Sequence, residues 1–208
     1  MTRRIFIERL RRQIYGDFPP DEAVITDNLV NQWVNDGLAL AAKTNYTDSV
    51  KLDNIGYVNN AFYSTFKGIS VTKDENFIWK ITLPEVPVAL GRNESISTLQ
   101  FKDSNGKLSF PVVWLNESQR GYYQTMRPVS NKLLAYNEGE YVYIISTILL
   151  DQYTGSVTMV SGGDSTNLDS TIIIPNDYVP IVVEYVKAQL AFEKAQPKDR
   201  ANDGLDQA

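Results

Sequence analysis

Apolar residues recur with two different periods along this 208-residue chain, and the change of period strongly constrains its fold. Near both ends they recur every three to four residues, as in helices that bury one face. Between about residues 55 and 174 they alternate with polar residues, as in half-buried strands. The pattern predicts an α+β chain whose N- and C-terminal helical segments pack together. A central antiparallel β module, a small sandwich or barrel, projects between them.

The first helix is expected over residues 2–15, where Thr2 can cap the start and Gly16 can end the last turn. One face is apolar and is formed by Phe6, Ile7, Leu10 and Ile14. The other face is basic and carries Arg4, Arg9, Arg11 and Arg12. Residues 1–16 hold five arginines and one glutamate, so this segment has a charge of +4 while the rest of the chain has −9.

Three interpretations of the basic helix face stay open. It is a solvated face beside an apolar stripe, a surface that docks on an acidic protein, or a contact to nucleic acid. The last is disfavoured because the sequence has no second basic patch and its pI is about 4.8. We expect Arg4, Arg9, Arg11 and Arg12 to contribute to a partner interface.

Two more helices are expected, from about Thr26 to Lys43 and over residues 178–195. Gly37 lies on the apolar stripe of the first of these, which indicates close approach of another helix. The C-terminal helix is apolar over more than one face, so it is either central in the fold or in contact with a neighbouring molecule. Its candidate interface residues are Ile181, Val182, Tyr185, Val186 and Phe192.

Turn residues between the alternating segments predict hairpins. Asp103 to Gly106 separates Leu99–Phe101 from Leu108–Phe110, and Tyr136 and Tyr141 flank a second turn. Further strands are expected around Trp79 and over Val157–Val160 and Thr171–Ile174. The expected division is a helical assembly domain, residues 1–50 with 176–208, and a β insertion domain, residues 51–175.

The chain contains no cysteine and no histidine. This excludes disulfides, thiolate and imidazole catalysis, and the usual zinc and iron–sulfur ligands. We therefore expect no enzymatic activity, no cofactor and no metal site. Asp103-Ser-Asn-Gly106 resembles the start of a calcium loop, but its glycine stands at position 4 instead of 6. The longest apolar run, Tyr141–Leu150, is too short to span a membrane.

Two groups of segments together carry a family resemblance. The first is Val58–Lys67 followed by Ile81–Pro84 and Val86–Leu90; the second is Ile174–Asp177 followed by a helix, Gln196–Asp199 and Asn202-Asp203. Their order resembles head-to-tail connector (ring or adaptor) proteins of tailed phages that infect Bacteroidetes, notably the crAss-like phages. The N-terminal helix pair, with Asp17 and Pro19-Pro20 between the helices, is similar to the start of phage head–tail adaptors.

The resemblance implies a non-enzymatic virion subunit, assembled in the host bacterial cytoplasm, that forms a dodecameric ring. The ring would lie next to the portal, surround the DNA channel and bridge portal and tail. Its partners would be other copies of itself, the portal protein and other connector or tail ring proteins. Genomic DNA would pass without sequence-specific binding, and no membrane would be involved. The alternative is a β-rich tail or carbohydrate-binding module of a phage particle.

Overall fold

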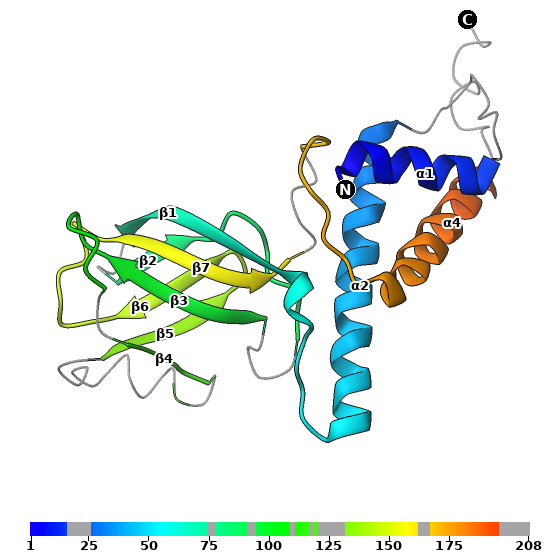
Figure 1. Cartoon of the computed structure of the whole chain (residues 1–208). Helices are drawn as coiled ribbons and strands as arrows, with labels where there is room; N and C mark the ends of the chain where they lie inside the picture. Colours follow the sequence, from blue (N-terminus) through cyan, green and yellow to red (C-terminus); the bar gives the residue numbers. More distant parts are fainter. Residues whose placement is uncertain are drawn as a thin grey trace, which may run out of the picture. The chain divides into compact units, whose positions relative to one another are not determined.

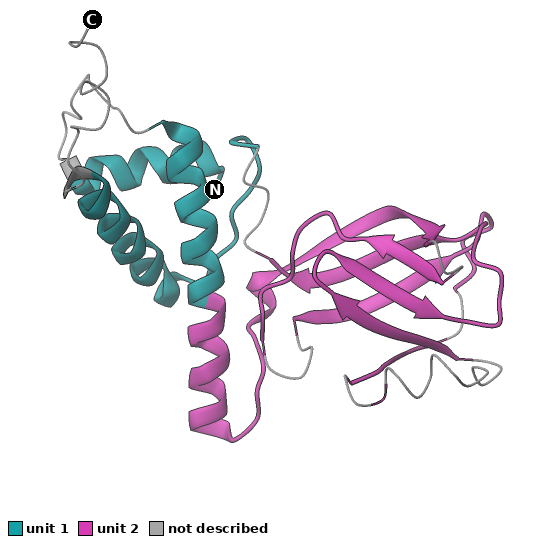
Figure 2. Ribbon diagram, turned by 180° about the vertical axis from the view of Figure 1, so that it is seen from behind, with its two compact units in different colours: residues 1–41, 164–208 teal, residues 42–163 magenta. Residues whose placement is uncertain are grey.

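A computed structural model describes residues 1–15, 26–74, 78–90, 95–108, 111–116, 119, 132–161 and 167–195. The chain divides into two compact units (Figure 2). The helical unit comprises residues 1–41 and 164–208, and the β unit comprises residues 42–163. The helical unit thus includes residues 164–175, which the sequence pattern assigned to the β insertion. The assembly role expected for the helical ends stays a prediction.

Three α-helices contribute to the helical unit (Figure 1): α1 (Arg3–Tyr15), α2 (Asp27–Asp53) and α4 (Val179–Ala195). A short 3-10 turn, η3 (Asn176–Tyr178), leads into α4. The expected helices over residues 2–15 and 178–195 are confirmed. Their buried apolar side chains in the helical unit are Phe6, Ile7 and Leu10 of α1, Val30, Trp33, Val34, Leu38 and Ala41 of α2, and Val182, Val186 and Leu190 of α4. Within the described residues, no helix is long and apolar enough to cross a membrane.

Helix α2 is longer than expected, because it ends at Asp53 instead of Lys43. Beyond Lys43 its buried positions are polar, so the apolar pattern fades although burial continues at Asn45 and Ser49. The Asn45 side-chain oxygen accepts a hydrogen bond from the Asn59 amide at 2.8 Å. The Ser49 hydroxyl accepts one from the Tyr57 amide at 3.1 Å. The last turns of α2 are therefore held by the chain that returns alongside them.

The β unit is a seven-stranded sheet with the order β3-β7-β1-β2-β6-β5-β4. Its strands are β1 (Tyr63–Lys73), β2 (Trp79–Thr82), β3 (Ile96–Lys102), β4 (Val112–Trp114), β5 (Leu133–Glu138), β6 (Tyr141–Ile145) and β7 (Thr154–Val160). The 3-10 turn η1 (Asn60–Phe62) precedes β1. Strand pairing is antiparallel as expected, except that β4 runs parallel to β5. The sheet is therefore mixed.

Strand β1 belongs to both halves of this sheet. Its first part pairs with β7, and Val71 to Lys73 pairs with β2. The register shifts between Lys67 and Ile69, where Gly68 has a positive φ of 72°. Such a bulge bends a strand and increases its twist. Side chains from both halves then share one core, which includes Phe101, Val157, Met159, Trp79, Ile81, Leu133, Val142 and Ile144. This barrel-like α+β arrangement confirms the expected fold class.

Both expected hairpin turns are present. The carboxylate of Asp103 accepts hydrogen bonds from the amides of Asn105 and Lys107 at 2.9 and 2.8 Å, and Gly106 has a φ of 77°. Residues 109 and 110 of that hairpin lie outside the described residues, as does residue 77 of the strand around Trp79. The same holds for Gly16, the Pro19-Pro20 turn and the C-terminal segment from Gln196. In the second hairpin, Glu138 pairs with Tyr141 across the turn.

The strand expected over Thr171–Ile174 is wrong. Thr171 forms an isolated bridge with Thr2, which places this segment in the helical unit. Hydrogen bonds from the Arg3 amide to the Ser170 carbonyl and from the Ile172 amide to the Met1 carbonyl, both 2.9 Å, flank this bridge. The pairing stops there because its partner chain becomes helix α1 at Arg3.

Candidate functional site

The candidate site is a set of surfaces, two on the helical unit and one on the β unit, and its description begins with the arginines of α1. The Arg4 Nε lies 3.2 Å from the Asp169 carboxylate, and an Arg11 nitrogen lies 2.7 Å from that of Asp27. Arg12 pairs with Glu8 one turn away on the same helix. Exposed pairs of this kind contribute at most about 1 kcal/mol each. Three of the four predicted arginines are thus partly neutralised by acids of their own unit.

Arg9 is the remaining member of this group. It is exposed and has no ionic partner among the described residues. A guanidinium in this state offers five donors to a carboxylate or an aromatic face of another molecule. Of the predicted arginines, it is the most available for an intermolecular contact.

The charge asymmetry of the sequence lies within the helical unit. This unit holds nine basic and fourteen acidic residues, whereas the β unit holds eleven of each. The net charge of −5 therefore belongs to the helical unit, where residues 1–16 carry +4 and the remainder −9. Residues 164–208 hold eight acidic and four basic residues, which gives this segment −4. The helical unit thus carries two segments of equal and opposite charge.

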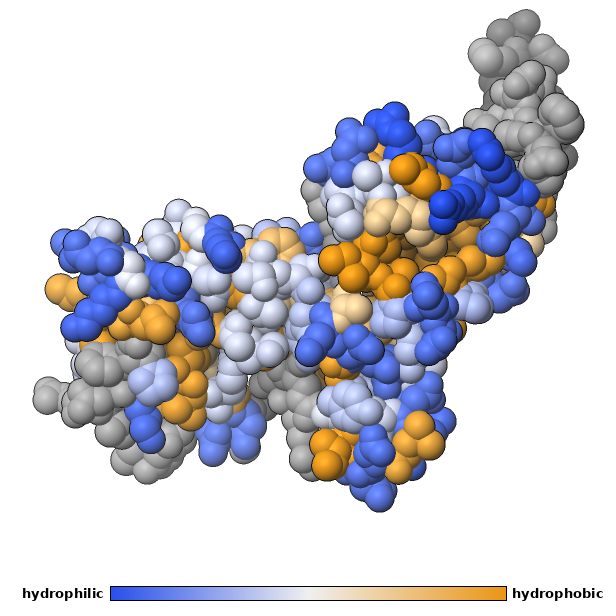
Figure 3. All heavy atoms as spheres, in the orientation of Figure 1, coloured by the Kyte–Doolittle hydropathy of each residue, from blue (hydrophilic) through white to orange (hydrophobic). Residues whose placement is uncertain are grey.

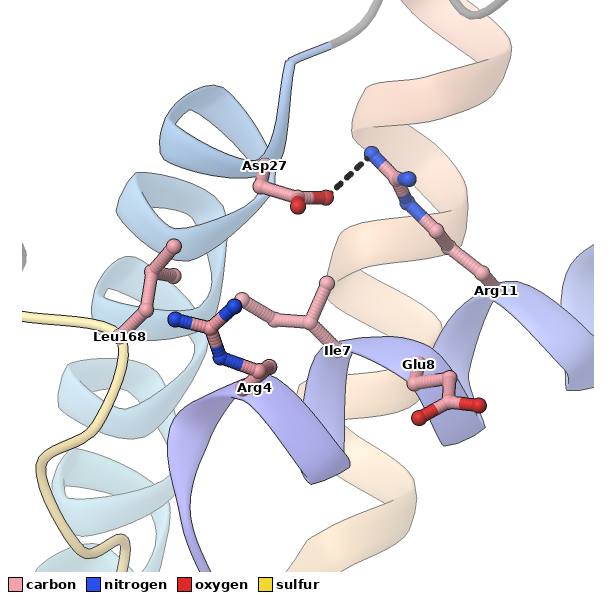
Figure 4. A pocket seen from close by; sticks show the side chains of 6 residues that line it. All are labelled: Arg4, Ile7, Glu8, Arg11, Asp27 and Leu168. Atoms are coloured by element: carbon pink, nitrogen blue, oxygen red, sulfur yellow. Dashed lines mark ion pairs between the residues drawn. The ribbon is translucent and has the colours of Figure 1, made fainter. Parts of the chain in front are cut away.

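A small cleft of about 170 Å³ lies between α1 and the start of α2 (Figure 4). Arg4, Ile7, Glu8, Arg11, Asp27 and Leu168 line it. The ion pair between Arg11 and Asp27 closes one side. The neighbouring Thr26 caps α2, because its hydroxyl accepts a hydrogen bond from the Leu29 amide at 3.3 Å. Among the described residues no group of acidic side chains is arranged to hold a metal ion.

The wide apolar spread of α4 resolves into two separate stripes. The first stripe consists of Val182, Val186 and Leu190, which are buried inside the helical unit. At its start, Gly37 of α2 lies against Val182: a Cβ at Gly37 would be only 3.0 Å from Val182 Cγ1. The expected close helix–helix approach at Gly37 is therefore confirmed. Val182 and Val186, proposed from the sequence as interface residues, support α4 from inside instead of facing a partner.

The second stripe, here called the outer stripe of α4, consists of Ile181, Tyr185, Ala188 and Phe192. These residues follow one another at intervals of four, three and four, so they share one face of the helix. Ile181 and Tyr185 are half-buried, Ala188 is exposed, and Phe192 is 61% exposed. At 1.5 Å per residue the outer stripe is about 16 Å long. It matches three of the interface residues predicted from the sequence.

A second surface lies on α1, directly opposite its buried stripe. Ile5 is 44% exposed and has Arg9 and Arg12 one and two turns further along the same face. We call Ile5, Arg9 and Arg12 the outer face of α1. An exposed isoleucine framed by arginines combines apolar area with charge, as do residues enriched in protein interfaces.

Arg3 was not predicted to have a structural role, yet at 2% exposure it is among the most buried of the described side chains. Its guanidinium donates a hydrogen bond of 2.9 Å to the Asn31 side-chain oxygen and a second one to that of Asn35. These bonds tie α1 to α2. The signal was its spacing, since Arg3 precedes Phe6 and Leu10 by three and seven residues on the buried stripe.

A third apolar surface lies in the β unit, at the C-terminal end of α2. Leu52 is 81% exposed, Ile55 66% and Tyr57 52%, and Figure 3 shows apolar side chains at this end of the helix. Asn54 ends the helix in the left-handed region with a φ of 56°. No residue of this surface was singled out from the sequence, because each is isolated in its local pattern.

The comparisons with known proteins identify a family. The family model described as phage tail ring protein 2 matches residues 20–207, which is most of the chain but excludes α1. No curated protein matches the sequence. The match covers α2, α4 and all of the strands that the structure describes, and it agrees with the resemblance to ring proteins seen in the sequence. The chain therefore belongs to the phage tail ring protein 2 family of crAss-like phages, whose members are components of the virion.

Proposed function

We propose that this tail ring protein is a structural subunit of the head-to-tail connector, in a portal-proximal ring that surrounds the DNA channel and bridges portal and tail. The observation that carries the proposal is the outer stripe of α4. The helical unit already has a buried core, so a further apolar stripe with a 61% exposed phenylalanine is suited to contact with a protein partner. Membership in a ring family makes other ring subunits the natural partners.

The charge distribution supports a surface along which DNA passes freely. The helical unit has an acidic excess and the β unit is neutral by count. A protein that binds DNA tightly needs many lysines or arginines that contact the phosphates, since counterion release dominates such binding. We propose that the ring is dodecameric and that genomic DNA passes it without sequence-specific contacts.

The proposed role is non-enzymatic. The chain has no histidine or cysteine, and the described acidic residues include no metal-binding group. The neutral β unit would contact neighbouring tail or ring proteins, and the apolar surface of Leu52, Ile55 and Tyr57 is the part of it best suited to that role. Assembly in the host cytoplasm is part of the same proposal.

The alternative role as a carbohydrate-binding module would need an exposed aromatic platform. The stacked pair Tyr136 and Tyr143, with ring centroids 5.1 Å apart, is the best aromatic pair of the described β unit. Tyr136 is only 4% exposed and packs with Leu115 and Leu134, so it belongs to a second small core. This pair therefore does not form an exposed platform for a sugar ring.

Electron cryomicroscopy of intact particles tests the proposal. We expect density for this chain in one ring between portal and tail, with the helical units forming the ring. A position at the distal end of the tail or in a fibre would contradict the connector role. Binding to surface glycans of the host on a glycan array would support the alternative module instead.

A further inference from the structure

We infer that neighbouring copies in the ring meet head to tail through the outer stripe of α4 of one copy and the outer face of α1 of the next. This inference rests on the ring assembly proposed above and names its contact. The occupant of the α4 stripe is thus a second copy of the same chain. Three features of the helical unit support this choice.

The first feature is that the two surfaces are different. A ring with more than two members needs heterologous contacts, in which each subunit uses one surface toward one neighbour and another surface toward the other. The helical unit offers two such surfaces, an apolar aromatic one on α4 and an apolar basic one on α1. They lie on separate helices, so one copy can use both at once.

The second feature is charge. The segment that contains α1 carries +4, whereas α4 itself (Val179–Ala195) is neutral by count, with two acidic and two basic residues. Asp177 and Glu193, at the two ends of the α4 region, are both exposed. The positive charge on the outer face of α1 disfavours contact between two α1 helices and favours a neutral or acidic surface such as the α4 region.

The third feature is the chemistry of the side chains. Arg9 is exposed without an ionic partner among the described residues, and Tyr185 and Phe192 on the α4 stripe are aromatic. Arginine on an aromatic face, next to an aliphatic contact such as Ile5, is a frequent arrangement at interface hot spots. The outer face of α1 also lies within a helix of 13 residues, about 20 Å long, which suits a stripe of about 16 Å.

The contact is small for a protein interface. One helix pair buries well below the roughly 800 Å² per partner of a standard complex. A single contact is therefore weak, and it becomes stable when the ring closes or forms on a partner, because each copy then makes it twice. A monomer in dilute solution is consistent with this contact.

Cysteine cross-linking tests the inference, and the chain offers a clean background because it has no cysteine. Two single variants, Ile5→Cys and Phe192→Cys, are made with tags of different size and mixed in equal amounts. Leu149→Cys, at a 69% exposed site of the β unit, is the matched control. The mixtures are oxidised at high protein concentration and in assembled particles, and the products are separated under non-reducing conditions.

We expect the mixed Ile5–Phe192 dimer to exceed both homodimers several-fold, whereas pairs that include Leu149→Cys give only background. A second variant, Arg9→Glu added to Ile5→Cys, should reduce the mixed dimer several-fold while the circular dichroism spectrum stays unchanged. If the homodimers form at or above the yield expected for random pairing, the inference is wrong. It is also wrong if the yield of the mixed dimer in particles is no higher than that of the control pairs.

Imaging and cross-linking together test the contact and the proposed location of the ring independently. If imaging places the ring elsewhere in the tail but the mixed dimer forms, the connector role fails and the contact stands. If the ring lies between portal and tail and the mixed dimer is absent, the contact fails and the connector role stands.

Discussion

The close approach at Gly37 makes the effect of one methyl group on stability predictable. In Gly37→Ala the new Cβ would lie 3.0 Å from Val182 Cγ1 and 3.2 Å from Val182 Cα. The second contact is with backbone, so α4 as a whole must move outward by a few tenths of an ångström. Overpacking of this kind costs about 1–3 kcal/mol. The gain in helix propensity from glycine to alanine is about 1 kcal/mol.

The overpacking cost exceeds the propensity gain, so we expect Gly37→Ala to lower the free energy of unfolding by about 1 kcal/mol. Urea unfolding followed by far-ultraviolet circular dichroism measures this change. Val182→Ala is the matched partner variant and removes two buried methyl groups, at a cost of about 2 kcal/mol. In the double variant, the methyl group at position 37 faces a smaller side chain at position 182. We therefore expect the double variant to be destabilised by about 1 kcal/mol less than the sum of the two single variants.

One result would refute this reasoning. If Gly37→Ala raises the free energy of unfolding by the full propensity gain, and the double variant is strictly additive, α2 and α4 do not touch at this point. The close approach of α2 to the start of the buried stripe of α4 would then lose its support.

Three further predictions concern single side chains. Ser49→Ala should lower the free energy of unfolding by about 1–3 kcal/mol, because a buried hydroxyl that joins α2 to the returning chain is lost; urea unfolding measures it. Asp27→Ala should cost about 0.5–1 kcal/mol through its ion pair and its place in the first turn of α2, and the cost should shrink in high salt. The hydrogen bond to Glu140 and its charge raise the pKa of Tyr141 above its ordinary 10.0, so Glu140→Gln should lower it in a spectrophotometric titration. The pKa of Tyr141 is higher in the folded state than in the unfolded state. Protonated Tyr141 therefore stabilises the fold below pH 10.0, and this stabilisation is lost as the pH rises through the folded-state pKa.

Local patterns were sufficient for the parts of the fold that depend on near neighbours. Helices α1 and α4 follow from apolar spacing, and the turn at Asp103 follows from side chains that bond their own backbone. The end of α2 could not be found in this way, because Asn45 and Ser49 take buried positions only when the returning chain supplies their hydrogen-bond partners. Strand β4 was missed because it has three residues and a parallel partner.

The candidate site shows the same limit. The sequence placed Ile181, Val182, Tyr185, Val186 and Phe192 in one group, since all are apolar on one helix. Only tertiary packing decides which of them face Gly37 and which face outward. Arg3 shows the converse, because a charged residue on the apolar stripe can be buried when two asparagines accept its hydrogen bonds.

Helix α2 determines how this protein can be divided into fragments. The boundary between the two units falls at residues 41 and 42, inside a continuous helix of 27 residues. A protease that needs an extended segment finds no substrate there, since each amide in mid-helix is bonded to a carbonyl one turn back. An expression fragment that starts at residue 42 would begin inside the helix, and its first four amides would have no intrahelical hydrogen-bond partner. A fragment meant to isolate the strands should therefore begin no later than Thr26, so that the helix keeps its capping residue.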